Sequence, residues 1–77
     1  MANSVFTDYL KTLVEYSEKV DAAEVSNDDY IEYQVLESWI LSAYQKGYYN
    51  QQAYKALTGI YYQIKDNFRT VLGLERS

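Results

Sequence analysis

The sequence predicts an all-α three-helix bundle in which neighbouring helices are antiparallel. Apolar residues recur at spacings of three and four along most of the chain, and residues that start and stop helices divide it twice. There is no alternating apolar and polar run long enough to indicate a sheet. We expect helices at about 4–24, 27–46 and 50–72, joined by short turns that favour antiparallel packing. A length of 77 residues predicts a single helical domain, 1–77.

The first helix, 4–24, is predicted from one continuous apolar face. The residues of this face share a spacing of three or four: Phe6, Tyr9, Leu10, Leu13, Tyr16, Val20 and Ala23. The opposite face is charged and is expected to lie in solvent, with Asp8, Lys11, Glu15 and Lys19. Glu15 and Lys19 are four residues apart in the favourable order for a helical ion pair.

The second helix, 27–46, has the clearest start. Ser26 and Asp29 have the spacing of a capping box, and Val25 and Tyr30 have that of a hydrophobic staple. Gly47 supplies a residue that takes the left-handed conformation at low cost and ends the helix.

This second helix is too apolar for one core face. Its main stripe is centred on Leu36, Ile40 and Ala43, with Tyr33 and Trp39 at the sides. A second apolar group lies away from that centre, namely Tyr30, Leu41 and Tyr44. A helix with two apolar faces lies between two neighbours or in an oligomer, and the sequence leaves both open. If it is an oligomer, we expect a homodimer formed through Tyr30, Leu41 and Tyr44.

The third helix, 50–72, is predicted to begin at the cap residue Asn50 and to end at Gly73. Its apolar face consists of Ala53, Leu57, Ile60, Tyr61, Ile64, Phe68 and Val71. A strip of small residues, Ala53, Ala56 and Gly59, includes a glycine that costs about 1 kcal/mol relative to alanine within a helix. We expect close packing inside the bundle to offset this cost, with a groove between molecules as the alternative.

The composition argues against several function classes. The sequence contains no cysteine and no histidine, which removes disulfides, thiolate nucleophiles, imidazole bases and nearly all zinc or iron sites. The acidic residues do not fit the register of a calcium loop, and there is no phosphate loop or glycine-rich cofactor turn. We therefore expect no enzyme, no metal and no cofactor. Neither a membrane-spanning run nor a signal peptide is evident, and with the lack of cysteine this predicts a cytoplasmic protein.

The net charge of −4 is unevenly distributed. Residues 1–37 hold nine acidic and two basic residues, whereas 38–77 hold two acidic and five basic residues. The acidic candidates for partner binding are Asp21, Glu24, Asp28, Asp29 and Glu32. They suit a basic partner, such as a nucleic-acid-binding protein. The main hypothesis is a small, acidic, non-enzymatic protein-binding regulator or inhibitor, in the manner of the DNA mimics that phages and mobile elements encode.

Ten tyrosines are the most unusual feature of the composition. Tyr9, Tyr16, Tyr33 and Tyr61 lie on the predicted core faces, where a phenol ring is buried and its hydroxyl finds a partner. We expect the acidic surface that binds a partner to be rich in tyrosine as well, because tyrosine is frequent in protein interfaces. A possible second surface combines tyrosines with bases: Tyr48, Tyr49, Lys55, Tyr62 and Arg69.

Two alternative functions remain open. Residues 43–56 have small residues and a turn glycine at positions typical of a helix-turn-helix, with Gln51, Gln52 and Lys55 at the start of a recognition helix. The acidic charge and the scarcity of bases in this segment disfavour direct binding to nucleic acid. The second alternative is a structural protein that assembles with itself.

Overall fold

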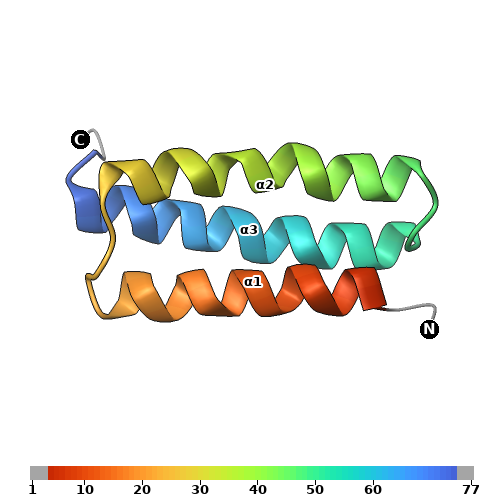
Figure 1. The fold of residues 1–77 in the computed structure, drawn as a ribbon, viewed down its shortest axis with the longest axis horizontal. Coiled ribbons are helices and arrows are strands. Elements are labelled where there is room, and N and C mark those ends of the chain that lie inside the picture. Colours follow the sequence, from red (N-terminus) through yellow and green to blue (C-terminus); the bar gives the residue numbers. More distant parts are fainter. Residues whose placement is uncertain (1–3, 75–77) are drawn as a thin grey trace.

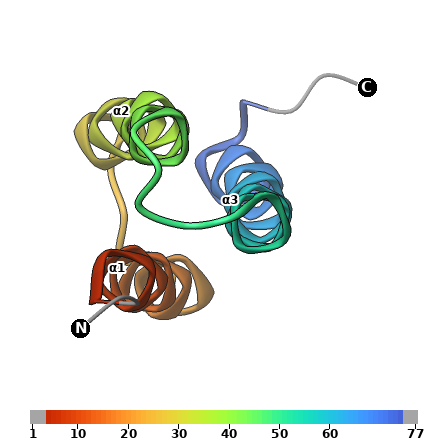
Figure 2. The same ribbon diagram turned by 90° about the vertical axis from the view of Figure 1, so that its right-hand side faces the viewer.

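The computed structural model describes residues 4–74 and confirms the three-helix bundle. The helices are α1 (Ser4–Asp21), α2 (Asn27–Gln45) and α3 (Gln51–Leu72), and they run alongside one another with alternating direction (Figure 1). Viewed along the bundle, they stand at the corners of a triangle (Figure 2). The helix α3 packs closely against both α1 and α2, which contact each other much less. The predicted domain, 1–77, includes residues 1–3 and 75–77, which lie outside the described part of the chain.

The starts of α2 and α3 confirm the predicted caps. The Ser26 hydroxyl accepts the Asp29 backbone N–H at 3.2 Å, and the Asp29 carboxylate accepts the Ser26 N–H at 3.0 Å, which completes the capping box. The Asn50 side chain accepts the Ala53 N–H at 2.9 Å. Each cap provides an acceptor for a backbone donor that the first turn of a helix leaves without one.

All three helices end in the same backbone motif, in which a left-handed residue follows the last turn. This residue is Gly47 after α2 (φ 86°) and Gly73 after α3 (φ 72°), as predicted. After α1 it is Ala23 (φ 58°), and the next residue, Glu24, donates its N–H to the Lys19 carbonyl at 2.9 Å. The predicted extension of the first helix to residue 24 is therefore wrong, because this motif stops α1 at Asp21 without a glycine.

The core contains residues from all three helices and from the second turn. Its members are Leu13, Val20, Tyr33, Ile40, Ala43, Tyr49, Leu57, Tyr61, Ile64 and Phe68. A second layer of half-buried apolar side chains packs around it and includes Phe6, Tyr9, Tyr16 and Leu36. The centres of the three predicted apolar faces are thus confirmed.

Four residues predicted on or beside the core faces are exposed. Ala23 lies in the turn beyond α1, and Ile60 and Val71 lie at the edge of the α3 face. Trp39, placed at the side of the α2 stripe, is 58% exposed. The cause for Trp39 is the weak contact between α1 and α2, which leaves the edge of α2 that faces α1 uncovered.

Candidate functional site

The outer face of α2 carries an exposed apolar stripe, which we define as Ile31, Val35 and Trp39. These residues are four apart, so they lie on one side of the helix, and they are 62%, 48% and 58% exposed. The buried residues of α2, such as Tyr33 and Ile40, lie on another side. This stripe is therefore an apolar surface that the bundle itself does not cover.

Opposite charges stand at the two ends of the α2 stripe. Asp28 lies one turn before Ile31, in the first turn of the helix, and Lys46 lies two turns after Trp39, at its C-cap. Both side chains are exposed, and so is Glu32 beside the stripe. Spacings of four and seven residues place Asp28, Val35, Trp39 and Lys46 on the same side of α2. The stripe is thus apolar in its middle, acidic at its start and basic at its end.

A hollow of about 540 Å³ opens beside the end of the stripe, between α1 and α2. Its lining consists of Val5, Tyr9, Trp39, Ser42, Ala43, Lys46 and Tyr48. The Tyr9 hydroxyl approaches the Trp39 carbonyl across it at 3.5 Å, at the long limit of a hydrogen bond. The hollow exists because these two helices contact each other least, and it gives the stripe a concave neighbour.

The three residues predicted for self-association lie on a different side of α2, the side that faces α3. The Tyr30 ring lies 5.4 Å from that of Phe68, and the Tyr44 ring stacks on that of Tyr54 at 4.5 Å. Both tyrosines are half-buried against the core, whereas Leu41 is 38% exposed. Of the two arrangements that the sequence left open, the structure thus shows Tyr30 and Tyr44 packed between neighbouring helices, and self-association through these residues stays a prediction. Ile31 and Val35 were not predicted as surface candidates, although their spacing of four residues with Trp39 was a signal available in the sequence.

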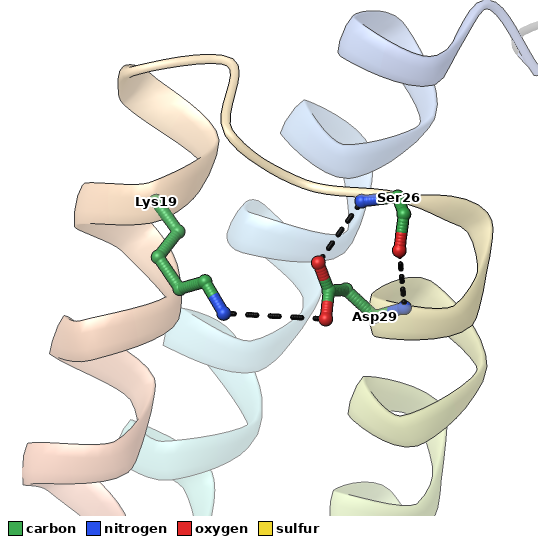
Figure 3. A network of polar contacts seen from close by, with 3 residues as sticks. All are labelled: Lys19, Ser26 and Asp29. Atoms are coloured by element: carbon green, nitrogen blue, oxygen red, sulfur yellow. Dashed lines mark hydrogen bonds and ion pairs between the residues drawn. The ribbon is translucent and has the colours of Figure 1, made fainter.

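The predicted acidic residues lie at one end of the bundle, around the turn from α1 to α2 (Figure 1). Asp21, Glu24, Asp28 and Glu32 are exposed. Asp29 is half-buried and is already engaged, because it closes the capping box with Ser26 and lies 4.0 Å from Lys19 (Figure 3). Across residues 4–74, no three acidic side chains are placed together as metal ligands. The role of this end in binding a basic partner stays a prediction.

The predicted second surface does not form a single patch. Tyr49 is buried in the core, where its hydroxyl donates to the Ile40 carbonyl at 2.5 Å, so its assignment to a binding surface is wrong. Tyr48 is exposed and lines the hollow between α1 and α2. The other three residues follow α3, where Lys55 and Tyr62 are exposed and Arg69 is half-buried.

Tyr62 connects α3 to α2 on the surface. Its hydroxyl donates to the Glu37 carboxylate, and the ammonium of Lys65 lies 5.8 Å from the centre of its ring. The hydrogen bond to Glu37 raises the pKa of the Tyr62 hydroxyl. Through its contact with Glu37, Tyr62 therefore links α3 to α2.

Gly59 does not pack closely inside the bundle. A β-carbon built at this position would meet no atom within 4 Å, and the residue is exposed. It lines a groove of about 320 Å³ between α1 and α3, together with residues that include Leu10, Val14 and Ile60. The predicted explanation by internal packing is therefore wrong, and the groove lies on the surface of the bundle.

Within residues 4–74, no helix combines the length and the apolar character that crossing a membrane requires. The chain matches no protein-family model, and neither the curated proteins nor the solved structures contain a match to it.

Proposed function

We propose that this chain is a non-enzymatic regulator that binds another protein, and that the outer face of α2 is its docking surface. The observation that carries this proposal is the exposure of Trp39, with Ile31 and Val35 aligned before it and a hollow beside it. Tryptophan is among the residues that contribute most to binding when a partner removes them from water. Removing apolar area from water favours association, and the three side chains supply such area on one helix face.

The charges around the stripe define the chemistry of the partner. Asp28 and Glu32 are exposed beside the apolar residues, and Asp21 and Glu24 lie at the same end of the bundle. A suitable partner therefore has an apolar ridge with lysine or arginine next to it, because complementary charges accelerate association and exclude wrong partners. The proposal therefore requires a basic side chain of the partner beside its apolar contact, and the expectation of a partner that is basic overall stays a prediction.

The helix geometry does not favour the helix-turn-helix alternative. The helices α2 and α3 lie side by side and antiparallel along the bundle (Figure 1). In a helix-turn-helix the two helices meet at about 90–120°, which lets the second helix enter the major groove of DNA. Only Lys46 and Lys55 are available near this turn to contact phosphates.

Photo-crosslinking in the cell that makes the protein tests the proposal. A photoreactive amino acid is placed at Val35 and, as a matched control, at Val14 of α1, because both valines are 48% exposed. We expect a specific crosslinked protein at position 35 and none at position 14. The purified protein so identified should bind the wild-type chain and the Val14→Ala variant but not Trp39→Ala. Equal labelling at the two positions would contradict the proposal.

A further inference from the structure

We infer that the protein bound by the outer face of α2 is a second copy of this chain, packed so that the two α2 helices are antiparallel. This inference rests on the proposed function, since it names the partner of the same surface. Its basis is the pair of opposite charges at the ends of the stripe, with Asp28 before Ile31 and Lys46 after Trp39. A surface with opposite charges at its two ends complements itself when a copy is turned end to end.

One antiparallel register brings the opposite charges of the two copies together. It places Asp28 of each copy against Lys46 of the other and Val35 against Trp39. A two-fold axis repeats each pair, so two ion pairs flank the apolar contacts. A parallel pair would instead put Asp28 against Asp28 and Lys46 against Lys46, and like charges opposed in this way are destabilising. The antiparallel arrangement also places the positive end of each helix dipole beside the negative end of the other, which is favourable.

The size of the contact predicts a dimer that dissociates on dilution. The helix α2 has 19 residues, which corresponds to a length of about 28 Å. A single helix face of that length and about 10 Å in width is smaller than the ~800 Å² that each partner contributes to a standard interface. We therefore expect an equilibrium between monomer and dimer, and no permanent assembly.

Sedimentation equilibrium of the full chain over a range of concentrations tests the inference. The mass should rise from 9.0 kDa towards twice that value. Trp39 is the only tryptophan in the sequence and lies in the proposed contact, so its fluorescence follows the same equilibrium. Dilution should shift its emission to longer wavelength as water returns to the ring. A mass that stays at 9.0 kDa up to millimolar concentration would overturn the inference.

Two sets of variants test the contact and its direction. Val35→Glu should weaken the dimer at least tenfold, and Val14→Glu should leave it unchanged, with circular dichroism confirming that both variants remain helical. Asp28→Lys and Lys46→Asp should each weaken the dimer, and the double exchange should restore it, because each lysine then faces an aspartate again. A dimer that withstands Val35→Glu, or is not restored by the double exchange, would contradict this arrangement.

The crosslinking experiment separates failure of the inference from failure of the proposed function. A monomeric chain whose position 35 crosslinks to a different protein overturns the inference and leaves the function of the α2 face standing. A monomeric chain without a specific crosslink at position 35 overturns both.

Discussion

Tyr33 of α2 and Tyr61 of α3 stack on each other and each hydroxyl reaches the backbone of the opposite helix. The ring centres are 4.7 Å apart and the ring planes differ by 9°. The Tyr33 hydroxyl donates to the Tyr61 carbonyl at 2.8 Å, and the Tyr61 hydroxyl approaches the Gln34 carbonyl at 3.5 Å. A carbonyl has two lone pairs, so one within a helix can accept a phenol as well as the helical N–H. Two fully buried rings therefore have partners for their hydroxyls.

Removing the two hydroxyls should have unequal effects. Tyr33→Phe is expected to lower the free energy of unfolding by about 1 kcal/mol, the typical net value of a buried hydrogen bond. Tyr61→Phe should cost less, because its hydrogen bond is longer by 0.7 Å (3.5 against 2.8 Å) and so weaker. Urea unfolding of both variants and of the double variant measures each cost and the coupling. A larger cost for Tyr61→Phe would contradict this ranking.

Alkaline pH should destabilise the bundle through its buried tyrosines. Burial raises the pKa of the Tyr33 and Tyr61 hydroxyls above the ordinary value of 10.0, and it raises the pKa of Tyr49 to about 12. Below pH 10 these hydroxyls are protonated in both the folded and the unfolded chain, so their contribution to stability is complete. Above pH 10 only the unfolded chain loses the protons, which draws the equilibrium towards unfolding. The contribution of Tyr49 is lost between pH 10 and about 12.

The free energy of unfolding should fall by up to about 1.4 kcal/mol per pH unit for each such tyrosine in this range. Urea titrations at a series of pH values measure the slope, and tyrosinate absorbance follows ionisation. Tyr49→Phe serves as a control, since it removes one ionising group and should make the decline between pH 10 and 12 less steep. A free energy of unfolding that stays constant above pH 10 would mean that the fold does not raise the pKa of these hydroxyls.

Ala23→Gly should stabilise the protein. Ala23 has φ 58°, a conformation that costs an L-residue about 1–2 kcal/mol and that glycine adopts readily. After allowing for the greater freedom of glycine in the unfolded chain, we expect a gain of about 0.5–1 kcal/mol in the free energy of unfolding. Ala22→Gly is the control, because Ala22 has no positive φ and should only lose stability. A loss of stability in Ala23→Gly would contradict the left-handed end of α1.

Gly59→Ala should also stabilise the protein, by about 1 kcal/mol, because alanine is the better helix former and the added methyl group meets no atom. The reverse change at a nearby exposed position of the same helix, Ala56→Gly, should cost about the same amount. Thermal unfolding of the two variants measures both shifts. If Gly59→Ala were destabilising, another side chain would have to occupy the groove between α1 and α3.

The predictions from sequence succeeded where a structure depends on neighbours along the chain. The Ser26 and Asp29 capping box, the Asn50 cap and the helix ends at Gly47 and Gly73 each follow from a few adjacent residues. The predicted end of α1 was wrong because an alanine gives no local sequence signal for the left-handed conformation that Ala23 adopts. Tyr49 was mispredicted as a surface residue, since only the folded turn brings its hydroxyl to the Ile40 carbonyl.

The three helices and the centre of each buried face follow from the sequence, because helical periodicity assigns every side chain a direction around the helix axis. Which edges of those faces are covered depends on how the helices pack against one another. On α2, the helix α3 covers Tyr30 and Tyr44, whereas α1 contacts α2 only weakly and leaves Trp39 exposed. Periodicity is a property of one helix, but coverage depends on the distances between helices, which are set by the packing of side chains from all three.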